Sequence, residues 1–128
     1  MYLRFRVDVR DASSGQPSGV FSAVYDLIDS DLLPQQDLDV AKSCLDWFDT
    51  NLKEPASFSK STKPHAQKVG ISWFKDSATE HISKMRMLVA LLEDNSVSVK
   101  LLITDNPGYI LYEDDYQVVS DPHPNTPT

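Results

Sequence analysis

Apolar residues recur along this chain at two different spacings, and this change of spacing limits the folds that the chain can adopt. From Leu3 to Val9, every second residue is apolar, which is typical of a strand that buries one face. Between Leu38 and Leu52, apolar residues return at every third or fourth position, as they do on the buried face of a helix. One chain therefore carries both kinds of element, each with one face directed to a core.

The same spacing rules divide the rest of the chain into further elements. A three-turn helix capped by Ser18 is expected from Val20, although alternation from Phe21 makes a strand the competing interpretation. Residues 77–80 have the S-x-x-E form of a capping box, which begins a helix. The expected strands cover 2–10, 69–74, 97–103, 109–112 and 116–119, and the expected helices cover 20–28, 34–52 and 78–92.

This order of elements predicts an α+β fold with a mixed or antiparallel sheet of four or five strands. About three helices are expected to pack mainly on one face of that sheet. We expect residues 1–121 to form a single domain, because 128 residues is the length of one domain and the sequence has neither an internal repeat nor a sign of a second domain. Residues 122–128 contain three prolines and no apolar residue, so a mobile tail is expected there.

The balance of charge argues against two classes of partner. The 128 residues include 12 basic and 19 acidic side chains, which gives a net charge of −7. Proteins that bind the phosphates of nucleic acids usually carry the opposite charge, and an anionic membrane surface repels an acidic chain. The chain also has neither an apolar run of transmembrane length nor a signal-peptide pattern at its start, so a cytoplasmic protein is expected.

The residues that usually hold metals and cofactors are sparse. Cys44 is the only cysteine, which excludes an internal disulfide or a pair of cysteine ligands for zinc. His65, His81 and His123 do not have the spacing of a zinc site, and the glycine motifs that bind phosphate are absent from the sequence. The acidic run at 113–115 lacks the spacing of a calcium loop, and it fits a solvated turn better. We therefore expect no metal and no cofactor.

Charge is also unevenly distributed along the chain. Residues 26–49 hold seven carboxylates and one lysine. This acidic stretch is the solvated face of helices, a docking surface for a basic partner, or a mimic of the charge of nucleic acid. Residues 53–75 hold five lysines and one glutamate. This basic segment could attract an anionic ligand, or it could neutralise acidic residues of its own molecule or of a neighbour.

Residue types that bind ligands are most concentrated around the expected junction of strand and helix near residue 75. Trp73 and Lys75 end the strand, and His81 lies in the first turn of the helix, where the helix dipole disfavours a charged imidazole. Tyr109 follows an expected type II turn and could return to the same end of the sheet. These four residues would border one cleft suited to a small anionic or aromatic ligand. His81 is the candidate catalytic base in that cleft.

Three segments carry a resemblance to known proteins: ISWFK at 71–75, EHI at 80–82 and PGYILYEDDYQVV at 107–119. Together they resemble a group of small bacterial proteins described only as hypothetical, over roughly residues 1–120. The resemblance implies a bacterial cytosolic protein, and it supplies no catalytic residues. Short acidic proteins of this kind also resemble the cargo of mobile elements such as integron cassettes.

These features favour a small binding module over an enzyme, with a small molecule or a protein as its partner. A homodimer could form through an exposed strand edge or through the side of the second helix that carries Trp47. One alternative is a small hydrolase in which His81 acts with Glu80 or Glu113. The other alternative is an inhibitor whose acidic face blocks a nucleic-acid-binding protein.

Overall fold

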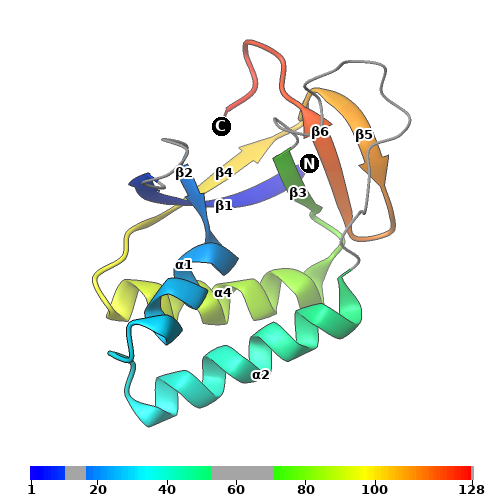
Figure 1. Cartoon of the computed structure of the whole chain (residues 1–128). Coiled ribbons are helices and arrows are strands. Elements are labelled where there is room, and N and C mark those ends of the chain that lie inside the picture. Colours follow the sequence, from blue (N-terminus) through cyan, green and yellow to red (C-terminus); the bar gives the residue numbers. More distant parts are fainter. Residues whose placement is uncertain (11–16, 53–70, 128) are drawn as a thin grey trace. The chain divides into compact units, whose positions relative to one another are not determined.

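The structure is a computed structural model that describes residues 1–10, 17–52 and 71–127 (Figure 1). The basic stretch at 53–68 and the start of the strand expected at residue 69 lie outside the described residues. The elements are the strands β1 (Tyr2–Arg10), β2 (Pro17–Gly19), β3 (Ile71–Lys75), β4 (Val99–Thr104), β5 (Tyr109–Glu113) and β6 (Gln117–Asp121), and the helices α1 (Val20–Asp29), α2 (Gln35–Asn51) and α4 (Thr79–Asp94). The fold is α+β in the order that the apolar spacing predicts, with the short strand β2 added before α1.

The chain forms two compact units, and each has its own buried side chains. The first unit contains residues 1–4, 52–82 and 102–128, and the second contains residues 5–51 and 83–101. Strands β1 and β4 and helix α4 each pass from one unit to the other. Trp73 and Val118 are among the most buried residues of the first unit, and Val24 and Leu88 are among those of the second.

The strands join in the order β2-β1-β3-β6-β5, and β4 pairs with β1 outside this path. The pairings with a defined register are antiparallel. In the first unit, Trp73 of β3 and Glu113 of β5 both lie opposite Val118 of β6. Strand β6 is therefore central in this unit, and its residues from 117 to 120 are buried on both faces.

The turn before β5 depends on a glycine. Gly108 has a φ angle of +105°, which residues with a side chain rarely adopt, and a Cβ atom there would collide with the carbonyl oxygen of Asp121. A positive φ angle at this position agrees with the type II turn expected at Pro107 and Gly108. The hydroxyl of Ser120 donates a hydrogen bond of 2.6 Å to the Pro107 carbonyl oxygen, which ties the turn to β6.

Residues near the C-terminus contact the same turn. Thr126 is buried, and its hydroxyl donates a hydrogen bond of 3.1 Å to the Asn106 carbonyl oxygen. The same hydroxyl accepts a bond of 3.2 Å from the backbone N–H of His123. The sequence predicts a mobile tail because it contains no apolar residue, but a hydroxyl can be anchored by a carbonyl that no apolar pattern reveals.

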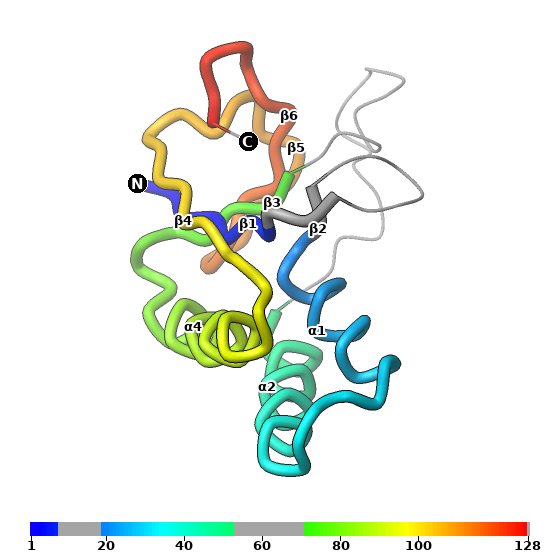
Figure 2. Tube along the Cα trace, turned by 90° about the vertical axis from the view of Figure 1, so that its left-hand side faces the viewer, coloured from blue at the N-terminus to red at the C-terminus, as the bar shows by residue number. Residues whose placement is uncertain are grey.

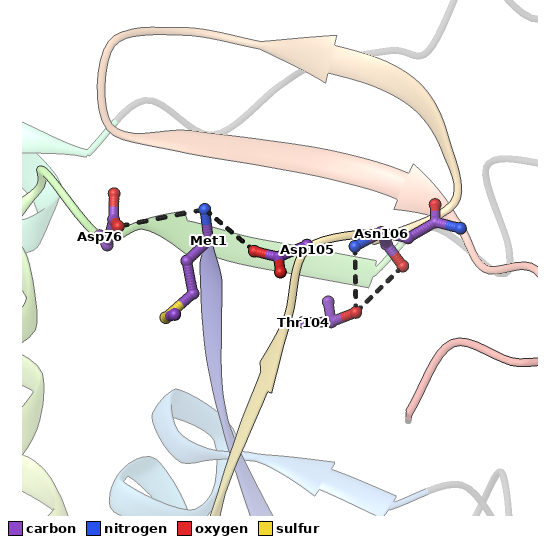
Figure 3. Close-up of polar contacts among 5 residues, drawn as sticks. All are labelled: Met1, Asp76, Thr104, Asp105 and Asn106. Atoms are coloured by element: carbon purple, nitrogen blue, oxygen red, sulfur yellow. Dashed lines mark hydrogen bonds and ion pairs between the residues drawn. The ribbon is translucent and has the colours of Figure 1, made fainter.

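The start of β1 makes two ion pairs and a hydrogen bond within the first unit (Figure 3). The amino group of Met1 lies 3.6 Å from the Oδ1 atom of Asp105 and 4.0 Å from the Oδ2 atom of Asp76. The backbone N–H of Asp76 also donates a hydrogen bond of 3.2 Å to the Met1 carbonyl oxygen. In the neighbouring loop, the backbone N–H of Asn106 donates a bond of 3.1 Å to the Thr104 hydroxyl. Both carboxylates are exposed, so the ion pairs contribute little to stability.

In the second unit, α1, α2 and the part of α4 that belongs to this unit lie on one side of its strands (Figures 1 and 2). Helices α1 and α2 meet through Phe21 and Phe48, whose rings pack edge to face with centroids 5.0 Å apart. The N-cap of α1 is Gly19, one residue after the expected Ser18 cap. Cys44 of α2 is buried, and this burial raises the pKa of its thiol, so the residue behaves as a small apolar side chain.

Strand β4 departs most from the burial that the sequence predicts. The alternation of Val99, Leu101 and Ile103 predicts a buried face, but Ile103 is 49% exposed and Leu101 is also exposed. Alternation records which residues share a face of a strand. It does not record whether another layer covers that face.

Candidate functional site

The hairpin turn between β5 and β6 is organised by one carboxylate. The Oδ1 atom of Asp114 accepts hydrogen bonds from the backbone N–H groups of Tyr116 (2.9 Å) and Gln117 (3.0 Å). Its Oδ2 atom accepts bonds from the Tyr112 hydroxyl (3.0 Å) and from the Gln117 side-chain amide (3.1 Å). Burial by itself raises the pKa of Asp114, but these hydrogen bonds outweigh burial and lower that pKa. The turn therefore holds an ionised carboxylate in a defined position.

Lys75 is held at the same end of the sheet by an ion pair. Its Nζ atom lies 2.7 Å from the Oε2 atom of Glu113, and its backbone N–H donates a bond of 2.9 Å to the Tyr116 carbonyl oxygen. The hydrogen bond to Glu113 raises the pKa of Lys75, and the negative charge of Asp115 acts in the same direction. The lysine therefore stays charged, but a carboxylate already matches its charge.

A surface depression with a volume of about 500 Å³ lies beside this ion pair. It is lined by Lys75 and by the six successive residues 110–115 of β5 and its turn. Because it touches every residue from Ile110 to Asp115, the depression runs along β5 and its turn. The lining contains three carboxylates and one ammonium group, which leaves a net charge of −2.

His81 lies in the first turn of α4, as the sequence predicts, but its ring is not open to solvent. Only 4% of the residue is exposed, and the imidazole stacks on the ring of Tyr116 with centroids 4.3 Å apart. The ring of Phe74 is also close, with its centroid 6.3 Å from that of His81. This packing denies the imidazole the access to substrate that a catalytic base needs.

His81 is buried because it shares the buried face of α4. The sequence predicts a buried face of Ala78, Ile82, Met85, Val89 and Leu92, with Leu88 and Leu91 beside it. These residues are buried except Ile82 and Val89, which are half-buried, and His81 takes the core position between Ala78 and Met85. Sequence reasoning missed His81 because a polar imidazole interrupts an otherwise apolar pattern.

The other two predicted site residues lie elsewhere in the first unit. Trp73 is 1% exposed, and its indole N–H is buried without a hydrogen-bond partner among the described residues. Tyr109 is 49% exposed and pairs with Asp121 at one end of β6, whereas Lys75 bonds to Tyr116 at the other end. Five residues of strand separate these ends, which is roughly 16 Å. The structure therefore brings Lys75 and His81 to one end of the sheet and leaves Tyr109 at the other, so the four residues do not border one cleft.

Sequence reasoning also missed the residues that build the depression. The Tyr112 hydroxyl reaches Asp114 two residues later, but a tyrosine two residues before an aspartate is too common a spacing to predict such a bond. The pairing of Glu113 with Lys75 joins two strands that are distant in the sequence, so no local pattern could reveal it. Within the described ranges, no group of three or more histidine, cysteine or carboxylate side chains is placed to hold a metal ion.

Comparison with protein-family models, with curated proteins and with solved structures found no match. In the part of the chain that the structure describes, no helix is both long and apolar enough to span a membrane.

Proposed function

We propose that this chain is a small binding module and that the depression along β5 takes a cationic group, such as the side chain of a lysine or an arginine. The observation that carries this proposal is the 2.7 Å ion pair between Lys75 and Glu113. Because the pair cancels the positive charge of the lining, Asp114 and Asp115 leave the depression negative.

This charge is the reverse of the one that the sequence suggests. Lys75 by itself favours an anionic ligand, but an anion in the depression would compete with Glu113 for the lysine and would be repelled by Asp115. A cation is attracted to Asp115, whose side chain is exposed. The apolar stem of a lysine or arginine can lie against Ile110, which also lines the depression.

The proposal is tested by titrating isotope-labelled protein with lysine amide and, separately, with N-acetylglutamate. We expect lysine amide to shift the NMR amide signals of residues 110–115 until they saturate, and N-acetylglutamate to leave them in place. The affinity for lysine amide falls as salt is added, because the charges that attract it are solvent-exposed. Equal shifts with both compounds, or shifts outside the depression alone, would contradict the proposal.

Two variants with the same change of charge distinguish binding in the depression from a general attraction to the net charge of the protein. Asp115→Asn removes a carboxylate from the depression, whereas Asp46→Asn removes an exposed carboxylate from α2. We expect Asp115→Asn to weaken lysine amide binding by about threefold or more and Asp46→Asn to leave it unchanged. Equal effects would mean that lysine amide responds only to the net charge.

The acidic helices support a second candidate function, which is the docking of a basic protein. Between residues 26 and 49, six aspartates are exposed, and Leu32 in the connection between α1 and α2 is 77% exposed. An exposed apolar side chain among carboxylates is a feature of docking surfaces. A lysine-rich peptide distinguishes the two candidates. If the peptide docks on the acidic helices, the double variant Asp31→Asn and Leu32→Ser abolishes its binding. If it binds in the depression, Asp115→Asn abolishes its binding.

The hydrolase alternative has less support from the geometry. His81 is buried against Tyr116, and its neighbour Glu80 is exposed on α4. A general base and a substrate need to meet within hydrogen-bond distance, and the stacked ring covers the imidazole on one face.

A further inference from the structure

Strand β5 ends the sheet in the first unit, because β6 is its neighbour on one side and no described strand pairs with its other side. The outer edge of such a strand presents backbone N–H and C=O groups that can pair with another chain. We propose that an extended basic peptide adds to this edge as a further antiparallel strand and supplies the cationic group. This inference rests on the proposed function and specifies its partner.

The depression lies where strand addition requires it. Its lining includes every residue from Ile110 to Asp115, so the open space runs along the strand that the peptide would extend. A peptide that pairs there gains backbone hydrogen bonds along its length. Its specificity comes from side chains at every second position, which meet the side chains of β5 on the same face.

A bulge in β5 decides which side chains share a face. Ile110 lies opposite Ser120, and Glu113 lies opposite Val118, with the register shift between Ile110 and Tyr112. Since Ser120 and Val118 are two residues apart in β6, the bulge brings Ile110 and Glu113 to the same face of the sheet. Without the bulge, residues three apart would point to opposite faces.

This arrangement predicts the order of side chains in the partner. On one face, the incoming strand meets the exposed apolar side chain of Ile110 and, two positions along, the carboxylate of Glu113. An antiparallel partner reaches the Glu113 end with its own N-terminal end. The peptide therefore carries a basic residue, then any residue, then an apolar residue, with further basic residues before them to meet Asp115.

The acidic end of β5 favours a basic peptide over a second copy of this chain. In an antiparallel pair of two β5 strands, the carboxylates of Glu113, Asp114 and Asp115 of one copy would face the Tyr109 end of the other. Residues 105–111 hold no basic side chain, so a second copy offers these carboxylates no opposite charge. A basic peptide places a positive charge opposite them.

The test uses an acetylated, amidated peptide of seven residues with lysine at positions 1 and 3, valine at position 5 and threonine elsewhere. Two derivatives are methylated on backbone nitrogens, one at the odd positions 3, 5 and 7 and the other at the even positions 2, 4 and 6. In an added strand, alternate N–H groups point to the protein and to solvent. We expect one methylated set to weaken binding at least about tenfold and the other to change it less than about threefold. A third peptide exchanges lysine 3 and valine 5, and we expect it to bind about fivefold more weakly or worse.

The possible results separate the proposed function, the strand pairing and the register of the peptide. If lysine amide and all peptides fail to bind, both the proposed function and the strand addition are wrong. If the peptide binds but both methylated sets bind alike, the depression takes a cation without strand pairing, and this inference is overturned while the proposed function stands. Equal binding of the exchanged peptide would overturn the antiparallel register. Loss of peptide binding in Asp115→Asn, with binding retained in Asp46→Asn, supports the proposed site.

Discussion

The imidazole of His81 stacks on the phenol ring of Tyr116, with ring centroids 4.3 Å apart and ring planes 26° from parallel. His81 opens helix α4, and Tyr116 belongs to the turn that leads into β6, so this contact joins the helix to the hairpin within the first unit. The tyrosine is exposed and the histidine is buried, so the tyrosine ring shields one face of the imidazole from solvent. The contact also supports the turn that carries Asp114, Asp115 and the acidic end of the depression.

The stack predicts a difference between two substitutions of His81. His81→Ala leaves a cavity beneath Tyr116 and is expected to lower the free energy of unfolding by roughly 2–4 kcal/mol. His81→Phe keeps an aromatic ring in the stack and is expected to cost roughly 1.5 kcal/mol or less. Urea denaturation measures both changes. If the two variants lose the same stability, the polar contacts of the imidazole matter more than its stacking.

The hydrogen bonds of Asp114 predict how stability depends on pH. Its pKa is lowered in the folded protein, so the stability that it contributes is complete above its unfolded pKa of about 3.9 and is lost as the pH falls through the folded value. We expect Asp114→Ala to lower the free energy of unfolding at pH 7 by roughly 1–3 kcal/mol. Between about pH 5 and pH 2, this variant should lose less stability than the unchanged protein, because it has already lost the contribution of this carboxylate.

Asp115→Asn is the matched control for this measurement, because Asp115 is the exposed neighbour of Asp114 in the same turn. We expect Asp115→Asn to keep the steep loss of stability in acid that the unchanged protein shows. Denaturation midpoints in urea at several pH values provide the comparison. Parallel curves for Asp114→Ala and for the unchanged protein would assign the acid sensitivity to other carboxylates.

The end of α4 predicts a substitution that stabilises the protein. Ser96 has a φ angle of +67°, and its N–H donates a bond of 3.1 Å to the Glu93 carbonyl oxygen, as in a glycine-terminated helix. We expect Ser96→Gly to raise the free energy of unfolding by about 1 kcal/mol, because glycine adopts this conformation without strain. Ser98, which does not have a positive φ angle, is the control. Ser98→Gly is expected to be neutral or slightly destabilising, and a gain equal to that of Ser96→Gly would show that relief of strain at Ser96 is not the cause.

Two different expectations for the C-terminal residues can be distinguished by experiment: a mobile tail, as the sequence predicts, or a tail anchored through Thr126. A mobile tail predicts that deletion of residues 122–128 changes the melting temperature by less than about 2 °C. The bond from Thr126 to the Asn106 carbonyl oxygen instead predicts that Thr126→Val lowers the melting temperature by about 3–5 °C. Thr126→Ser, which keeps the hydroxyl, should cost less than Thr126→Val. Changes below about 1 °C in all three proteins would show that the contact adds no stability in solution.

The sequence predicted the elements well where burial is a local pattern. The alternation from Leu3 and the stripe through Ala41, Leu45 and Phe48 match β1 and the buried face of α2. It did not predict the burial of His81 in α4, because residue type alone cannot separate a buried polar side chain from an exposed one. It also did not predict that Leu101 and Ile103 of β4 are exposed, because coverage by another layer is not a property of the strand itself.

For the candidate site too, the sequence predicted some features and the tertiary structure decided the others. From the sequence alone, Lys75 and His81 could be placed at a junction between strand and helix, because both lie within ten residues of the change from one apolar spacing to the other. Their chemical roles were decided by the tertiary structure. The register of β3, β6 and β5 places Glu113 beside Lys75 and so turns a predicted anion site into a negative depression. The helix packing places His81 against Tyr116. The periodicity of apolar residues indicates which face of a segment is buried. The residues that pack against that face lie far away in the chain, and only the tertiary structure brings them together.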